Sequence, residues 1–276
     1  MNKATKIRLG AVNYLNTRPL VYGLERRAPN IDLVFDLPSR LADGLAAGVF
    51  DVALIPSIEL FQDPSYRTVS NVCIGCRGPV LSVKLFSHVA VDKIRTLYLD
   101  EGSRTSAALV QILLAERFGV RPLLRTLPIN ASVDSSLLAP GESDAVLLIG
   151  DRAIHSPPGR FAVVWDLGDE WLQWSGLPFV FAMWTARAGV ELGDLDVALE
   201  QSRDDGLAHV DEIAHAEAAK LGLTMPQCRS YLLDNLNFEF GPRERRGLSL
   251  FYQKAASLGL APLGVDLGYE DCEVAR

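Results

Sequence analysis

The chain has 276 residues, of which 49% are hydrophobic and 22% are charged. This length and composition allow a substantial core, in one large domain or in two lobes of ordinary size. The formal net charge of −7 argues against a nucleic-acid partner, which favours a clustered basic surface. The same charge opposes an anionic ligand at long range, so local groups must hold any such ligand.

The beginning of the chain lacks the uninterrupted apolar region of a secretory signal peptide, because Arg8 and Asn13 fall within it. The longest apolar stretches, residues 145–149 and 177–184, are too short to span a bilayer. We therefore expect a cytoplasmic protein with no membrane partner. The sequence indicates no particular oligomeric state.

Cysteines and histidines do not form a recognisable metal site. Cys73 and Cys76 have the spacing of a zinc or redox pair, but Cys228 and Cys272 are too far apart to supply the second close pair of a zinc ribbon. We interpret all four as reduced structural thiols. The sequence also lacks a Walker loop, a dinucleotide-binding glycine motif and a G-x-S-x-G motif. We expect no metal and no cofactor.

Short apolar runs alternate with helical patterns along the first half of the chain. We expect Thr17 and Ser39 to cap the first two helices, with Pro19 in the first helical turn. One passage predicts strands at 7–12, 31–37 and 51–55 and helical segments at 18–27, 39–47 and 57–61. The next passage predicts strands at 96–99, 123–127 and 145–149 and helices at 106–118 and 132–138.

The two passages form a weak internal repeat. Gly48 precedes Gly141 by 93 positions, and Asp51 precedes Asp144 by the same number. The repeat implies two similar α/β lobes, and the alternation of strands with helices favours mainly parallel sheets. Ligands of such sheets bind beyond the carboxyl ends of the strands. We therefore expect the polar loops that follow the first strand of each lobe to line one cleft.

The remaining chain returns to the first lobe and ends in helices. We expect crossings between the lobes near 82–85 and 181–185. Lobe 1 is then discontinuous, comprising 1–84 and 184–276, and lobe 2 comprises 85–183. The patterns predict strands at 179–184 and 237–240 and helices at 194–202, 207–221, 226–235 and 242–258.

Three polar segments are candidates for ligand binding, and each has a structural alternative. Residues 13–19 offer two asparagines, a threonine and an arginine, more than helix capping alone requires. Ser103, Arg104, Thr105 and Ser106 gather hydroxyls and a guanidinium at a helix start, which suits a carboxylate or phosphate, although a solvated cap explains them too. Residues 75–82 combine glycines and a proline with Ser82, either as a binding loop or as a turn with an incidental serine.

Three further residues are weaker candidates for the cleft. Glu59 is interpreted as part of a solvated helix face, with a place in the cleft as the alternative. Trp171 and Trp174 are interpreted as core residues, although aromatic side chains also suit a cleft wall.

Five segments of the chain carry motifs that are specific in combination, whereas each alone is a weak signal. They are 10–20 (GAVNYLNTRPL), 78–82 (GPVLS), 103–106 (SRTS), 148–151 (LIGD) and 174–182 (WSGLPFVFA). These segments resemble motifs of one enzyme family, chorismate dehydratase of the futalosine route to menaquinone. They occur in the family's order across residues 7–185, and the tail through 238–241 also fits.

The resemblance implies an α/β, two-lobed fold of the type II periplasmic-binding-protein kind with a central cleft. It implies a lyase that dehydrates chorismate to 3-[(1-carboxyvinyl)oxy]benzoate. Asn16 and Ser82 match the family's two catalytic polar residues. The hydroxyls of 103–106 and Gly150 match its substrate-binding positions. The motifs offer no histidine as a base, and a proposal for the family is that the substrate's own enolpyruvyl carboxylate takes the proton.

Three other functions share this fold or pathway. A solute receptor of a transporter needs export, for which the sequence shows no signal. An effector domain of a regulator needs a DNA-binding segment, for which the start of the chain leaves no room. The related enzyme that acts later in the same pathway has a different N-terminal motif from residues 13–19.

Overall fold

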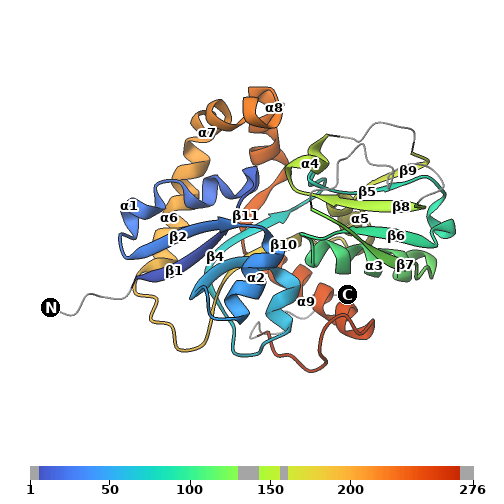
Figure 1. Ribbon diagram of the computed structural model, residues 1–276, viewed down its shortest axis with the longest axis horizontal. Coiled ribbons are helices and arrows are strands. Elements are labelled where there is room, and N and C mark those ends of the chain that lie inside the picture. Colours follow the sequence, from blue (N-terminus) through green and yellow to red (C-terminus); the bar gives the residue numbers. More distant parts are fainter. Residues whose placement is uncertain (1–5, 130–142, 156–160, 268–276) are drawn as a thin grey trace.

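The computed structural model describes residues 6–129, 143–155 and 161–267, which form two lobes lying side by side (Figure 1). The larger lobe contains β1 (Ile7–Val12), β2 (Ile31–Asp36), β3 (Val52–Pro56), β4 (Arg67–Cys76), β10 (Phe179–Ala186) and β11 (Asn237–Glu239). The smaller lobe contains β5 (Val83–Ser87), β6 (Thr96–Asp100), β7 (Leu123–Leu127), β8 (Ala145–Ile149) and β9 (Val163–Asp166).

Helices surround both sheets. In Figure 1 the helices α7 and α8 lie above the larger sheet and α9 lies below it. The α-helices are α1 (Leu24–Arg27), α2 (Pro38–Ala46), α3 (Thr105–Phe118), α4 (Asp151–Ile154), α5 (Leu167–Ser175), α6 (Leu195–Ala208), α7 (Val210–Glu217), α8 (Met225–Ser230) and α9 (Pro242–Ser257). Short 3-10 turns include Leu15–Thr17, Pro19–Val21 and Ser57–Phe61, and Tyr231–Asn235 form a π-helical turn.

The internal repeat appears as a repeated strand order. In the larger sheet, β1 pairs in parallel with β2 and β3, and β10 runs antiparallel beside β3. In the smaller sheet, β6 pairs in parallel with β7 and β8, and β5 runs antiparallel beside β8. The expectation of mainly parallel sheets was wrong, because each sheet adds antiparallel strands to a parallel group of three. The full orders are β11-β4-β10-β3-β1-β2 and β7-β6-β8-β5-β9.

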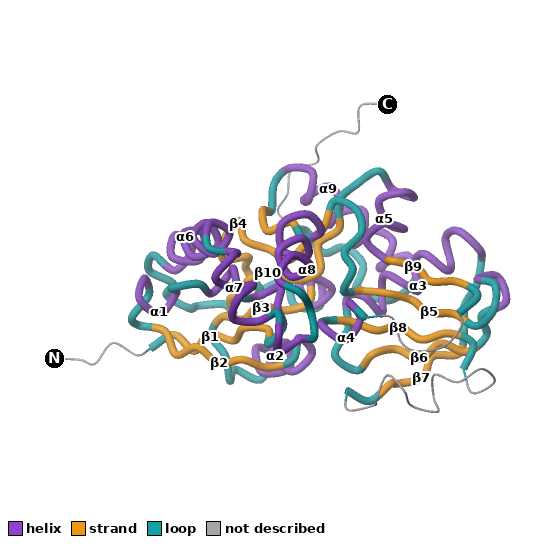
Figure 2. Tube along the Cα trace, turned by 90° about the horizontal axis from the view of Figure 1, so that it is seen from above, coloured by secondary structure: helices purple, strands orange, loops and turns teal. Residues whose placement is uncertain are grey.

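The strands at the centre of the sheets are almost entirely apolar, with Thr185 of β10 as their polar residue. Every residue of β3, β8 and β10 is buried. Central strands that are covered on both faces need continuous apolar sequence rather than alternation. The view from above in Figure 2 shows the two sheets next to one another, with the helices packed around them.

The matching aspartates of the repeat fix the start of β1 and β6, the middle strands of the two parallel groups. Asp51 accepts a hydrogen bond from the Arg8 N–H at 3.0 Å, at the start of β1. Asp144 accepts hydrogen bonds from the N–H groups of Arg95 and Thr96 at 2.8 and 2.9 Å, at the start of β6. The 93-residue repeat therefore reflects a shared way of satisfying main-chain donors.

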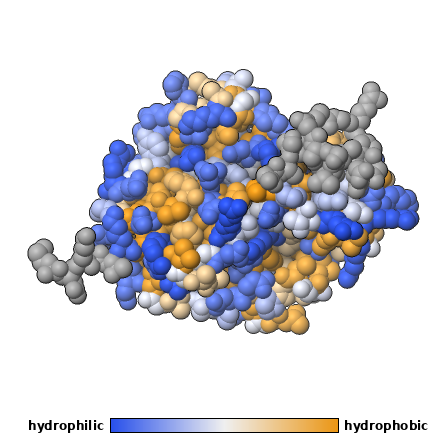
Figure 3. Space-filling model, in the orientation of Figure 1, coloured by the Kyte–Doolittle hydropathy of each residue, from blue (hydrophilic) through white to orange (hydrophobic). Residues whose placement is uncertain are grey.

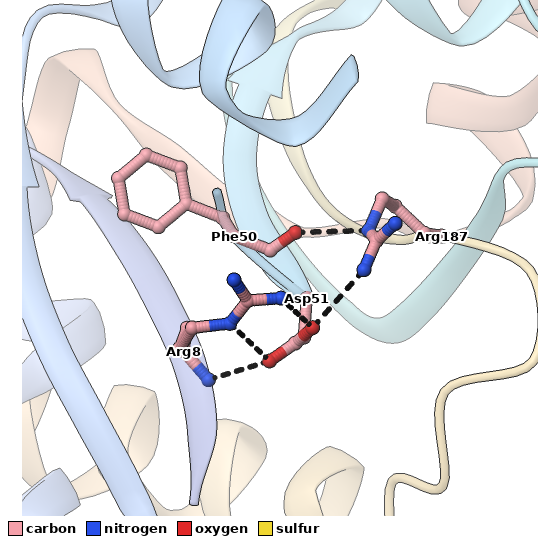
Figure 4. Close-up of polar contacts among 4 residues, drawn as sticks. All are labelled: Arg8, Phe50, Asp51 and Arg187. Carbon is pink, nitrogen blue, oxygen red and sulfur yellow. Dashed lines mark hydrogen bonds and ion pairs between the residues drawn. The ribbon is translucent and has the colours of Figure 1, made fainter. Parts of the chain in front are cut away.

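Asp51 also binds two arginines, as Figure 4 shows. Arg8 donates to it through Nε at 3.0 Å and Nη2 at 2.6 Å, and Arg187 donates through Nη2 at 3.2 Å. Arg187 also donates to the Phe50 carbonyl at 3.0 Å. These contacts join the chain next to β1, β3 and β10, and the Arg8 hydrogen bond is the main cause that lowers the pKa of Asp51 to about 2.

The predicted helix at 18–27 was wrong. Thr17 lies inside a buried 3-10 turn and caps no helix with its side chain, and a second 3-10 turn starts at Pro19. Gly23, with φ of 65°, then interrupts the chain before the single turn of α1. Ser39 is not a cap either, because α2 begins at Pro38 after Leu37.

Other differences concern elements with weak sequence signals. Strands β4, β5 and β9 and helix α5 were not predicted. The predicted helix at 207–221 begins within α6, which ends at Ala208. The second half of the predicted helix at 226–235 is the π-helical turn. The predicted helix at 132–138 lies outside the described residues.

The chain changes lobe at two short connections. It leaves β4 and reaches β5 through residues 77–82, and it leaves α5 and reaches β10 through residues 176–178. Strand β10 belongs entirely to the larger sheet, so residues 179–183, which the sequence division put in lobe 2, pair there instead. The division into a discontinuous lobe 1 and a continuous lobe 2 remains a proposal, with its boundaries at these connections.

Hydrophilic side chains separate several apolar areas on the face shown in Figure 3. Exposed large apolar residues include Val34 and Phe35 on β2 and Leu123 and Leu124 on β7, the edge strands of the two sheets. The Arg18 guanidinium lies 5.4 Å from the centre of the Phe35 ring.

None of the described helices has both the length and the apolar character needed to cross a membrane.

We expect Asp51→Asn to lower the free energy of unfolding by about 1 kcal/mol at pH 7, allowing for partial screening by solvent. The folded-state pKa is lowered, so this stabilisation is present above the ordinary range of a carboxylate. It is lost as the pH falls from about 4 towards 2. Urea unfolding of both proteins between pH 7 and pH 2.5 measures the difference. A difference that stays constant below pH 4 would contradict this account of Asp51.

Candidate active site

A cavity lies between the two lobes and takes its walls from both sheets. The residues that line it are Val12, Tyr14, Asn16, Pro38, Pro56, Ile74, Val80, Ser82, Val83, Gly102, Ser103, Arg104, Thr105, Ser106, Ile149, Gly150, Phe181 and Ala182. Most of them lie at or just after the carboxyl ends of β1, β3, β6 and β8, where ligands of α/β sheets bind. The loops that follow β1 and β6 therefore do line one cleft.

All seven predicted site residues line this cavity. Asn16 comes from the loop after β1, and Ser82 comes from the connection between β4 and β5. The group at 103–106 surrounds the start of α3, and Gly150 follows β8. The structure brings these positions together, and the roles assigned to them remain predictions.

The turn that carries Asn16 is held by the opposite lobe. The Leu15 N–H donates to Asp151 Oδ1 at 3.2 Å, across the cleft. Burial raises the pKa of Asp151 to about 6, and the Leu15 N–H and Arg18 oppose this rise. Asn16 is 9% exposed, and its Oδ1 accepts a hydrogen bond from the Thr17 hydroxyl at 3.3 Å. The main chain of the turn thus connects the lobes, and Asn16 forms part of the cavity wall.

Tyr14 explains why a glycine is required at position 150. A Cβ atom on Gly150 would lie 2.8 Å from Cζ of the Tyr14 ring, too close for any other side chain. The φ of Gly150 is 69°, which also favours glycine. Burial is the main cause that raises the pKa of Tyr14, so its hydroxyl is a neutral donor. Sequence reasoning missed Tyr14, although it lies within the quoted motif.

Ser82 lies where the chain enters the smaller lobe. It is 2% exposed, and its carbonyl accepts a hydrogen bond from the Gly150 N–H at 2.9 Å. The residue before it, Leu81, has a φ of 61°. The position of Ser82 is therefore set by a main-chain contact to the end of β8 and by an unusual backbone turn.

The start of α3 is only partly available to a ligand. The Thr105 hydroxyl accepts a hydrogen bond from the Ile58 N–H at 3.2 Å, across the cleft. Arg104 forms ion pairs with Asp43 at 2.7 Å and Glu59 at 3.2 Å. These two residues hold the lobes together, whereas the hydroxyls of the two flanking serines have no hydrogen-bond partner among the described residues. The N–H groups at the start of α3 have no side-chain cap.

Charged groups are scarce around the cavity. Among its described lining residues, Arg104 is the single cation, and two carboxylates neutralise it. No carboxylate and no imidazole belongs to that lining. No group of three or more His, Cys, Asp and Glu side chains in the described part of the chain is arranged to hold a metal ion. An anionic ligand here depends on hydroxyls and on the N–H groups of α3.

The weaker candidates lie outside the cavity. Trp171 is fully buried and donates through Nε1 to the Pro178 carbonyl at 3.1 Å, which confirms its interpretation as a core residue. The Trp174 ring packs against it, 5.4 Å away between ring centres. The interpretation of Glu59 as solvated was wrong, because its side chain is 19% exposed and paired with Arg104. Burial raises the pKa of Glu59, and Arg104 opposes the rise.

Tyr231 lies beneath the two predicted catalytic residues, and sequence reasoning missed it. It belongs to the π-helical turn and is 1% exposed. Burial raises its pKa, and the nearby side chains of Ser82 and Asn16 oppose the rise. Its hydroxyl has no partner of ordinary hydrogen-bond geometry within the described residues. π-Helical turns are rare and often occur at functional sites, but a helical sequence gives no sign of them.

None of the described cysteines lines the cavity. Cys73, Cys76 and Cys228 are free and buried, as the sequence predicted. Burial raises the pKa of Cys73 and Cys76, so both remain protonated thiols. Cys272 lies outside the described residues.

Known structures resemble this fold at low sequence identity. A protein from Archaeoglobus fulgidus superposes with a TM-score of 0.73 and 18% identity, covering 94% of this chain and 100% of its own. The periplasmic aliphatic sulphonate binding protein of Escherichia coli superposes with a TM-score of 0.60 and 15% identity, covering 96% and 91%. The two-lobed periplasmic-binding-protein-like fold is therefore confirmed.

Sequence comparisons identify the family. A family model described as "Menaquinone biosynthesis" matches residues 7–257. A protein of Thermus thermophilus named chorismate dehydratase is 32% identical over 273 residues, covering 92% of this chain and 97% of the relative. This chain therefore belongs to the menaquinone biosynthesis family.

Proposed function

We propose that this protein is a chorismate dehydratase, a lyase that converts chorismate to 3-[(1-carboxyvinyl)oxy]benzoate and water in menaquinone biosynthesis. The observation that carries the proposal is the cavity in which Asn16, Ser82 and the start of α3 converge, in a chain of this family. The Thermus thermophilus relative carries the name of that activity. A cytoplasmic location follows from the biosynthetic role and remains part of the proposal.

The reaction needs little more than deprotonation in the right place. The ring carbon that carries the enolpyruvyl ether loses its proton, and the negative charge spreads through a ring double bond into the ring carboxylate. The neighbouring hydroxyl group then departs, and together with the proton it makes one molecule of water. The ring becomes aromatic, so the second step is strongly favoured.

The substrate supplies the base in this proposal. No carboxylate or imidazole belongs to the described lining of the cavity, and its one cation is neutralised. The enolpyruvyl carboxylate of chorismate is tethered beside the proton that must leave, which gives it a high effective concentration. The protein then holds the substrate in the folded conformation that brings these two groups together.

Asn16 and Ser82 are proposed to donate hydrogen bonds to the charge that develops during deprotonation. Both side chains are buried, at 9% and 2% exposure, so their interactions with charge are weakly screened. Donors of this kind each lower a barrier by about 2.7–4 kcal/mol in enzymes that stabilise oxyanions. Asp151 of the opposite lobe holds the Leu15 N–H next to Asn16, and the Gly150 N–H holds the Ser82 carbonyl. Because the main chain at both residues is fixed in this way, little reorganisation is needed.

The start of α3 is proposed to bind the ring carboxylate. Ser103 and Ser106 are buried at 7% and 4% exposure and line the cavity beside the uncapped N–H groups of the helix. A helix N-terminus favours an anion through its partial positive charge. Thr105 and Arg104 contribute by holding the lobes together around the ligand, in addition to lining the site.

Replacing Asn16 or Ser82 separates catalysis from binding. We expect Asn16→Ala and Ser82→Ala each to lower kcat on chorismate by about 10²–10³, with a smaller change in KM. Asn16→Ser is the matched control, because it keeps a short polar side chain in the buried 3-10 turn, so its melting temperature reports any structural role of the asparagine. Turnover is followed by ultraviolet absorbance, alongside thermal melting. Well-folded variants with near-normal kcat would rule out the catalytic roles.

Two substitutions at the start of α3 distinguish ligand binding from lobe contact. We expect Ser106→Ala to raise KM more than it lowers kcat, with melting unchanged, because it removes binding common to both states. Thr105→Val is expected to raise KM and also to lower the melting temperature. It leaves the buried Ile58 N–H without an acceptor, at a cost of about 1–3 kcal/mol. An unchanged KM in both variants would contradict the proposed carboxylate site.

Activity is expected to need no added metal or organic cofactor. The proposed chemistry uses hydrogen-bond donors and the substrate's own carboxylate. Enzyme dialysed exhaustively against a chelator should keep its full kcat. Loss of turnover that one metal ion restores would overturn this expectation.

A further inference from the structure

The main chain in front of Ser82 adopts a rare and strained turn. The Ser82 N–H donates to the Val80 carbonyl at 2.7 Å, which closes a three-residue γ-turn with Leu81 at its centre. Leu81 has a φ of 61° and is the one residue other than glycine with positive φ among those described. A leucine at this φ is unfavourable, and such strain persists only where surrounding contacts maintain it.

Asp166, at the end of β9, provides those contacts. Its Oδ1 accepts a hydrogen bond from the Val80 N–H at 2.9 Å, and its Oδ2 accepts one from the Leu81 N–H at 2.7 Å. The same carboxylate caps α5, because Oδ1 also accepts from the N–H groups of Gly168 and Asp169 at 3.0 and 3.3 Å. One side chain therefore fixes the γ-turn to the start of a helix in the smaller lobe.

The surrounding packing leaves the turn little room to move. A Cβ atom on Gly168 would lie 2.5 Å from the Gly78 carbonyl oxygen, so the connection lies directly against the start of α5. From the larger lobe, Asn235 Nδ2 donates to the Pro79 carbonyl at 2.9 Å. The connection is thus held from both sides, and the Asp166 carboxylate is the group that binds the two residues immediately before Ser82.

We propose that Asp166 is a positioning residue, which maintains the γ-turn at Leu81 and so directs the Ser82 hydroxyl into the cavity. The inference rests on the proposed function, in which Ser82 stabilises charge on the reacting substrate. Asp166 does not line the cavity, and it acts through the main chain of residues 80–82. Helix capping of α5 is its second, separable role.

Asp166→Ser separates the two roles. A serine hydroxyl caps a helix well but is too short to reach Val80 and Leu81 as well. We expect kcat on chorismate to fall at least about tenfold and KM to change less than about threefold. The melting temperature should fall moderately, because the Val80 and Leu81 N–H groups lose their acceptor while the helix cap is kept. Asp166→Asn is the second variant. It keeps one oxygen acceptor for the cap and replaces the other by an amino group that cannot accept from an N–H.

The same substitution in the Ser82→Ala protein tests whether Asp166 acts through Ser82. If it does, Asp166→Ser lowers kcat little further in that background, as a double-mutant cycle measures. Normal kcat in both folded Asp166 variants, or an equal loss with and without the Ser82 hydroxyl, would overturn the positioning role. If Ser82→Ala itself keeps near-normal kcat, the proposed function of Ser82 fails instead, which is a distinguishable result.

Discussion

The contact between the Tyr14 ring and Gly150 is the constraint on which the rest of the site depends. A ring that packs against a main chain without a side chain brings the loop after β1 against the end of β8. The hydrogen bond from Leu15 to Asp151 fixes the same contact one residue further on. Once these strand ends meet, Asn16, Ser82 and the start of α3 necessarily surround one enclosed space. The lobes therefore build the site by meeting, and neither lobe holds it alone.

Electrostatics set the second constraint. Chorismate carries two carboxylates, the chain is acidic overall, and the one cation of the described cavity lining is already paired with Asp43 and Glu59. A free arginine would bind the substrate carboxylate strongly and stabilise the ground state as well as the transition state. Hydroxyls and helix N–H groups hold an anion less strongly. The described lining also offers no unpaired cation that would bind the enolpyruvyl carboxylate and lower its basicity, so in the proposed reaction that carboxylate can take the proton.

Much of the fold could be predicted from the sequence, because buried parallel strands have continuous apolar runs and the repeat at Asp51 and Asp144 marks equivalent strands. The predicted site residues were also brought together, since motif residues follow strand ends. The rest could not be predicted for physical reasons. The helix expected at 18–27 is replaced by a 3-10 turn that starts at Pro19 and by the single turn of α1 after Gly23, whose φ of 65° the sequence does not reveal. Tyr231 and Asp166 lie against residues that are far from them in the sequence, and no local pattern reports such contacts.

The central claim is that this cavity removes a proton and a hydroxyl group from chorismate. The most direct measurement uses chorismate with deuterium on the ring carbon that bears the enolpyruvyl ether, mixed with unlabelled chorismate and followed by nuclear magnetic resonance. The account predicts an aromatic product that has lost the deuterium, with the labelled substrate consumed more slowly because that bond breaks during the reaction. Chorismate that binds but remains unchanged, with its label in place, would contradict the account and leave a binding protein of the same fold.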